Sequence, residues 1–135
     1  MIFVDTGAWV ALSVATGRNA EAARAFHREV QRGEHGAPVT TDYVLDETAT
    51  LVRMDAGVEA AADAVRPILG SRSATAVWID PTHFEAALAL FDRHRDKRWS
   101  FTDCTSFVVM QDLGIENAFS FDRNFEQAGF DRRPH

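Results

Sequence analysis

Four carboxylate side chains stand where an acid would be buried or would face a ligand, and they are Asp5, Glu47, Asp103 and Asp122. Asp5 and Asp122 each directly follow an apolar run, Asp103 stands at the start of a predicted helix, and Glu47 lies on the apolar stripe of another. Carboxylates held together repel one another unless they bind protons or a hard cation, and oxygen-rich sites suit Mg²⁺ or Mn²⁺. The pattern therefore predicts a divalent-metal site.

Predicted strands and helices alternate along the whole sequence, which is typical of βαβ crossovers. Apolar runs predict strands at 2–4, 38–40, 76–79 and 118–121. Helices are predicted at 7–12, 19–33, 41–53, 57–69, 82–91 and 103–113, with a kink at Pro67 and a capping box from Thr82 to Glu85. We expect the α/β class, with a mostly parallel central sheet flanked by helices. In such a sheet ligands bind outside the carboxyl ends of the strands, so acids from separate elements can converge there.

Length and composition bound the possibilities. The 135 residues show no linker or repeat, which predicts a single domain over 1–135, and 46% hydrophobic with 25% charged residues is ordinary for a globular protein. One cysteine, Cys104, excludes an internal disulfide framework. No apolar run approaches the ~18 residues of a membrane span, so a cytoplasmic protein is expected. A net charge of -6 argues against a generic basic nucleic-acid coat but permits a metal-dependent nuclease.

Each acid also has a simpler interpretation. Asp5 and Asp103 can cap the helices that follow them, and Asp122 suits a turn. Glu47 is the hardest to dismiss, because an acid on an apolar face costs free energy unless it is paired or bound to metal. A salt bridge or a position at the boundary of the buried face remains the alternative for Glu47.

The densest basic stretch of the sequence contains Arg93, Arg95, Lys97 and Arg98 and ends beside Trp99. Such a stretch can follow a phosphate backbone while the aromatic ring stacks on a base. The solvated end of a helix explains the same residues equally well. RNA binding by these four side chains is therefore an expectation of lower weight than the metal site.

Four segments together resemble a PIN domain and, within that family, a VapC-type toxin ribonuclease. The matching segments are 2–9, 41–48, 101–107 and 119–125, and their order, their spacing and the total length all agree. The sequence departs from the family at two positions. Gly7 stands where serine is frequent, and Ser120 stands where threonine is frequent.

The resemblance implies a metal-dependent endoribonuclease that acts as the toxin of a toxin–antitoxin system. It assigns Asp5, Glu47, Asp103 and Asp122 as the catalytic acids that hold Mg²⁺ or Mn²⁺. Thr6 and Ser120 would be polar neighbours that orient those ligands. The implied partners are an RNA substrate, a cognate antitoxin protein and a second copy of the chain in a homodimer.

Two other functions stay open at this point. A non-catalytic PIN-like binding module would keep the fold without the chemistry, although a cluster of like charges costs stability without metal. A phosphoryl-transfer or receiver-type domain would use Asp5 as phosphate acceptor. The related phosphatases need a second Asp where Gly7 stands, and a receiver needs a late lysine, whereas the only lysine here is Lys97.

Overall fold

A five-stranded sheet in the order β3-β2-β1-β4-β5 forms the centre of this computed structural model, which describes residues 1–135. The strands are β1 (Ile2–Val4), β2 (Pro38–Thr41), β3 (Thr75–Val77), β4 (Asn117–Phe119) and β5 (Asp131–Arg133). Every pairing between neighbouring strands is parallel. The predicted α/β class with a parallel central sheet is therefore confirmed.

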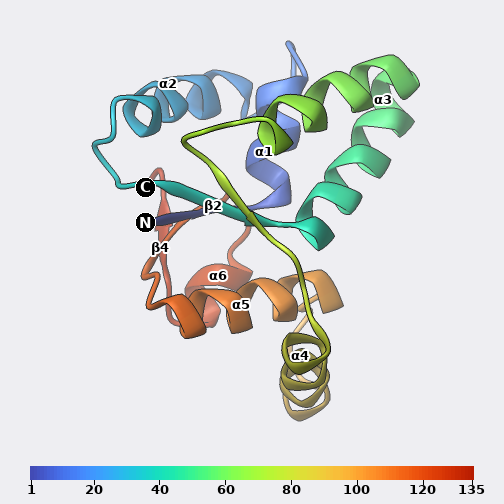
Figure 1. The fold of residues 1–135 in the computed structure, drawn as a ribbon, viewed down its shortest axis with the longest axis vertical. Helices are drawn as coiled ribbons and strands as arrows, with labels where there is room; N and C mark the ends of the chain where they lie inside the picture. The colour runs from blue at the N-terminus through green and yellow to red at the C-terminus, as the bar shows by residue number, and fades with distance from the viewer.

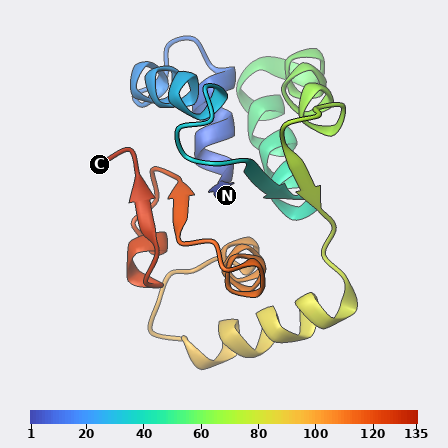
Figure 2. The same ribbon diagram turned by 60° about the vertical axis from the view of Figure 1, so that its left-hand side comes forward.

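Six helices cover the sheet: α1 (Thr6–Ser13), α2 (Ala20–Gln31), α3 (Asp42–Leu69), α4 (Pro81–Arg93), α5 (Phe101–Leu113) and α6 (Asn124–Gln127). Figures 1 and 2 show α1, α2 and α3 together on one side of the sheet and α5 and α6 on the other, with α4 farther out against α5. None of these helices has both the length and the apolar character needed to cross a bilayer.

Packing between aromatic rings holds α5 and α6 against the central strand, β1. Phe3 of β1 is fully buried, and its ring centroid lies 6.3 Å from that of Phe125 in α6. Phe125 in turn meets Phe107 of α5 edge-on at 5.0 Å. Strand β1 lies between β2 and β4 and is buried along its whole length, which explains its unbroken apolar run. The same contacts hold α5 and the start of α6 against β1.

The helix boundaries bear on two predictions. The predicted helices 41–53 and 57–69 are both present, on either side of a break in α3 at Gly57 (φ 91°, ψ 175°). Pro67, where a kink was expected, lies inside the second of these helices, and the residue with a non-helical backbone is Gly57. Only glycine adopts this backbone conformation without a steric penalty, because it lacks a Cβ atom.

The predicted capping box from Thr82 to Glu85 is wrong, because Asp80 and His83 form the capping box of this helix. Helix α4 begins one residue earlier, at Pro81, and the Asp80 carboxylate accepts a 2.8 Å hydrogen bond from the His83 main-chain N–H. Proline suits the first helical position because the N–H that it lacks would have no partner within the helix there. Strand β5 was not predicted, because its three residues Asp131–Arg133 are all charged.

Candidate metal centre

The candidate site lies where the strand order of the sheet reverses. From β1 the chain runs outward through β2 and β3 and then returns to β4 on the other side of β1. Ligands of parallel α/β sheets bind at this kind of switch point, outside the carboxyl ends of the strands. Asp5 follows β1 and Ser120 follows β4, so both side chains belong to this edge of the sheet.

Strand register explains the closest contact between them. Val4 lies opposite Phe119, which makes Asp5 and Ser120 the next neighbours across the β1–β4 pair. The Ser120 hydroxyl donates a 2.9 Å hydrogen bond to Asp5 Oδ2, and it accepts one of 3.0 Å from the Asp122 main-chain N–H. Ser120 thus connects the acid after β1 to the acid after β4.

Asp103 is the third residue of α5 and forms a capping box with Ser100. Asp103 Oδ2 accepts from the Ser100 main-chain N–H at 3.0 Å, and the Ser100 hydroxyl accepts from the Asp103 N–H at 2.9 Å. The capping interpretation is therefore correct for Oδ2. It does not account for Oδ1, which makes no hydrogen bond to any protein donor. Asp103 is 7% exposed and lines the cleft, so it can cap the helix and still leave one carboxylate oxygen without a protein donor.

A cleft of about 730 Å³ brings the four predicted acids together. Its lining includes Asp5, Glu47, Asp103 and Asp122, together with Thr6 and Gly7. Glu47 reaches it from the first half of α3, whereas Val44 and Thr48 on that segment are buried. Leu51 also lines the cleft and is 42% exposed.

Burial and mutual repulsion perturb two of these acids. Burial raises the pKa of Asp5 from 3.8 to about 7, and the neighbouring charge of Asp103 adds to the rise, while the Ser120 hydrogen bond opposes it. Burial is also the main cause that raises the pKa of Asp103, with the charges of Asp122 and Glu47 acting in the same direction. Both carboxylates would gain from a cation nearby, because a positive charge favours their ionised forms.

The residues present fit a hard divalent cation. The donors in the cleft are carboxylate and hydroxyl oxygens, with no thiol or imidazole among its lining residues. Thr6 supplies an independent indication, because its hydroxyl oxygen is buried and has no hydrogen-bond partner. Buried polar groups without a partner are rare, and a cation with its bound water would supply one. Asp5, Glu47, Asp103 and Asp122 would hold the ion.

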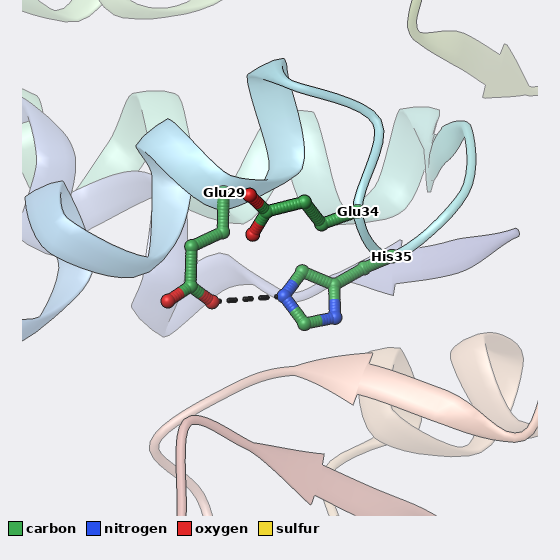
Figure 3. Close-up of side chains that lie close together, drawn as sticks. All are labelled: Glu29, Glu34 and His35. Atoms are coloured by element: carbon green, nitrogen blue, oxygen red, sulfur yellow. Dashed lines mark hydrogen bonds and ion pairs between the residues drawn. The ribbon is translucent and has the colours of Figure 1, made fainter.

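A second group of possible ligands lies before the amino end of β2, in the segment that follows α2 and in α2 itself. Glu29, Glu34 and His35 place one ligand atom each within 4.8 Å of one another, and none of the four predicted acids belongs to this group (Figure 3). Protein contacts account for it: His35 bonds Glu29 at 2.9 Å, and Glu34 pairs with Arg32 at 2.8 Å. Sequence spacing gave no indication of this network, which closes the end of α2.

The predicted basic stretch is divided between different surroundings. Arg98 lines the cleft, whereas Arg95 pairs with Asp92 and the Lys97 amine lies 3.5 Å from Asp96. Arg93 is exposed at the end of α4. The cleft has a second cation that sequence reasoning missed, Arg123, directly after Asp122. The four-residue RNA-binding prediction stays untested, and the geometry favours Arg98 among its members.

The family model of the PIN domain matches residues 2–131 of this chain. The chain belongs to the PIN-domain family. It is 35% identical over 133 residues to the 23S rRNA-specific endonuclease VapC20 of Mycobacterium tuberculosis, in two strains, covering 96% of this chain and 95% of the relative.

The solved structure of VapC20, described as a Sarcin-Ricin loop cleaving toxin, superposes with a TM-score of 0.87 at 35% identity. That match covers 96% of both chains. The resemblance to a PIN domain of the VapC type is thus confirmed, and the five-stranded parallel sheet is the PIN fold.

The raised pKa of Asp5 predicts how stability depends on pH in the metal-free protein. Between about pH 4 and pH 7, Asp5 is deprotonated in the unfolded chain but keeps its proton in the fold. The free energy of unfolding therefore falls as the pH rises through this range. In the Asp5→Asn variant, the free energy of unfolding should fall by at least about 1 kcal/mol less than in the wild type over this pH range, which corresponds to about one pKa unit.

Urea unfolding at several pH values, in the presence of chelator, measures this effect. The exposed acid Asp55 offers a matched control as Asp55→Asn. Parallel curves for wild type and Asp5→Asn would contradict the burial of an acid with a raised pKa.

Proposed function

We propose that this PIN-domain protein is a Mg²⁺- or Mn²⁺-dependent endoribonuclease and the toxin of a toxin–antitoxin pair. One observation carries the proposal: four acids from separate parts of the chain, Asp5, Glu47, Asp103 and Asp122, line a single cleft at the switch point of the sheet. Family membership and the named activity of VapC20 support the same conclusion.

Each residue of the site has a distinct part in the proposed hydrolysis. Asp5 and Asp103 are buried and would be the central ligands. Glu47 is half-buried and Asp122 is exposed, and both would complete the site. A bound divalent ion supplies an acidified water and neutralises charge on the phosphate. Ser120 holds Asp5 in place, and the Thr6 hydroxyl, which has no partner in the protein, would orient that water.

The substrate we propose is a structured ribosomal RNA loop, cleaved by hydrolysis of a phosphodiester to a 5′-phosphate and a 3′-hydroxyl. VapC20 is named for 23S rRNA and for the Sarcin-Ricin loop, and this chain aligns with it almost end to end. The half-buried ring of Phe121 lines the same cleft, where an unstacked base can lie against it. Such a substrate places the protein in the cytoplasm.

Two apolar surfaces support the proposed partners. Leu51 and Met54 are exposed three residues apart in the first half of α3, beginning at the cleft itself, and this surface suits an antitoxin segment that blocks the site. Phe84, Leu88 and Phe91 are exposed along one face of α4 and suit a second copy of the chain. Monomers seldom expose apolar side chains in such groups.

The α4 face predicts the oligomeric state. A charge at its centre, Leu88→Glu, should convert a homodimer to a monomer in sedimentation velocity, because the carboxylate would be buried without a partner. Met54→Glu makes the same change on α3 and should leave the dimer intact. A wild-type monomer, or a dimer unaffected by Leu88→Glu, would remove α4 as the interface.

Loss of either deep ligand should abolish cleavage. Asp5→Asn and Asp103→Asn keep the shape of each side chain but remove its charge, so divalent-ion binding should weaken and the cleavage rate should fall by more than about 100-fold. The assay compares cleavage of an RNA containing the Sarcin-Ricin loop sequence in Mg²⁺, in Mn²⁺ and in chelator. Circular dichroism checks the fold of each variant. Full activity in both variants would exclude the proposed nuclease centre.

The two cleft arginines should contribute to substrate binding. Arg98 and Arg123 make no ion pair with the site acids, so their guanidinium groups are free for RNA phosphates. Arg98→Ala and Arg123→Ala should each raise KM. Each should also make the plot of the logarithm of the RNA-binding constant against the logarithm of the salt concentration shallower, by about one unit of slope. Arg72→Ala, on the exposed turn before β3 at the far edge of the sheet, is the matched control. An unchanged salt slope would exclude phosphate contacts by these side chains.

A further inference from the structure

Asn124, the first residue of α6, contacts two of the four acids at once. Its side-chain Nδ2 lies 3.0 Å from Asp103 Oδ2 and 3.3 Å from Asp122 Oδ2. Its main-chain N–H donates to the other oxygen, Asp122 Oδ1, at 2.9 Å. A side-chain amide carries two N–H donors, so a single Asn can serve both carboxylates. The reverse orientation would set an amide oxygen against two anionic oxygens and is excluded by repulsion.

These contacts fix the orientation of Asp103. Its Oδ2 accepts from Asn124 on one side and from the Ser100 main-chain N–H, at 3.0 Å, on the other. Rotation of the carboxylate would break both hydrogen bonds. Oδ1 therefore stays the oxygen of this carboxylate that has no protein donor. The oxygen that remains for a cation is chosen by its neighbours before any ion binds.

Asn124 also completes a continuous chain of hydrogen bonds through the site. The chain runs from Asp5 through Ser120 to the main chain of Asp122, and from Asp122 through Asn124 to Asp103. Ser120 and Asn124 are both uncharged. They hold three acids near one another without removing the negative charge that attracts a divalent cation.

We propose that Asn124 is a positioning residue of the metal centre, which holds Asp122 against Asp103 and presents Asp103 Oδ1 to the cation. The inference rests on the proposed metal-dependent function. Outer contacts that orient metal ligands typically change metal affinity by about 10–100-fold when they are lost. Asn124 acts through Asp103 and Asp122 and need not touch the substrate.

The test compares how far MnCl₂ raises the melting temperature of wild type, Asn124→Ala and Asn124→Asp. In Asn124→Ala the acids lose their shared donor, so Mn²⁺ affinity measured by calorimetry should fall by about 10–100-fold and the rise should shrink. In Asn124→Asp a third carboxylate of the same shape repels the other two. Its metal-free melting temperature should fall, and its rise with Mn²⁺ should exceed that of wild type.

Opposite changes in the two variants separate positioning from a structural role, which would lower both melting temperatures and leave the Mn²⁺ effect unchanged. Asn19→Ala is the matched control, because the Asn19 side chain makes no capping hydrogen bond at the start of α2. Equal rises in wild type and both variants would overturn the role of Asn124 while the metal centre stands. A wild type that shows no Mn²⁺ effect would overturn the metal centre and this inference together.

Discussion

The rest of the site depends on the confinement of like charges at the end of the central strand pair. The β1–β4 register sets Asp5 beside Ser120. The first turn of α5, the helix that precedes β4, contributes Asp103 to the same cleft. Burial raises the pKa of Asp5 to about 7, and the neighbouring charge of Asp103 adds to the rise. The fold must therefore supply enough rigidity elsewhere to hold an arrangement that is unfavourable by itself.

That rigidity comes from the aromatic packing beneath the sheet. Phe107 of α5 and Phe125 of α6 stack edge-on at 5.0 Å, and Phe125 also meets Phe3 of β1. All three rings are buried. Because Phe107 and Phe125 lie within four residues of Asp103 and Asn124 respectively, the apolar core holds the polar site in place. The hydrophobic effect thus offsets the electrostatic cost of gathering the acids.

Local sequence pattern was enough to select the four acids that line the cleft, and the family resemblance added Ser120, but neither indicated Asn124 or Arg123. Asp5 and Glu47 stand out because an apolar run or stripe surrounds each, and the alternation of strands and helices predicts the sheet that gathers them. Asn124 and Arg123 sit in a polar turn, where nothing local separates a functional residue from a solvated one. Their roles depend on how α6 returns beneath β4, which follows from contacts between residues distant in the sequence. Strand β5 escaped prediction for the same reason, since only its pairing with β4 makes its charged residues a strand.

The choice of neutral donors around the acids has a functional consequence. Elsewhere in the molecule acids pair with cations, as Glu126 does with Arg132 at 2.6 Å. In the cleft the acids bond instead to a hydroxyl, to an amide and to main-chain N–H groups. A guanidinium bound to these acids would compete with a divalent ion, since arginine pairs with carboxylates strongly and in a fixed geometry. Arg98 and Arg123 line the same cleft without such pairs. In the proposed nuclease, this arrangement would leave the negative charge available to a metal ion and the positive charges available to phosphate, although both lie in one cleft.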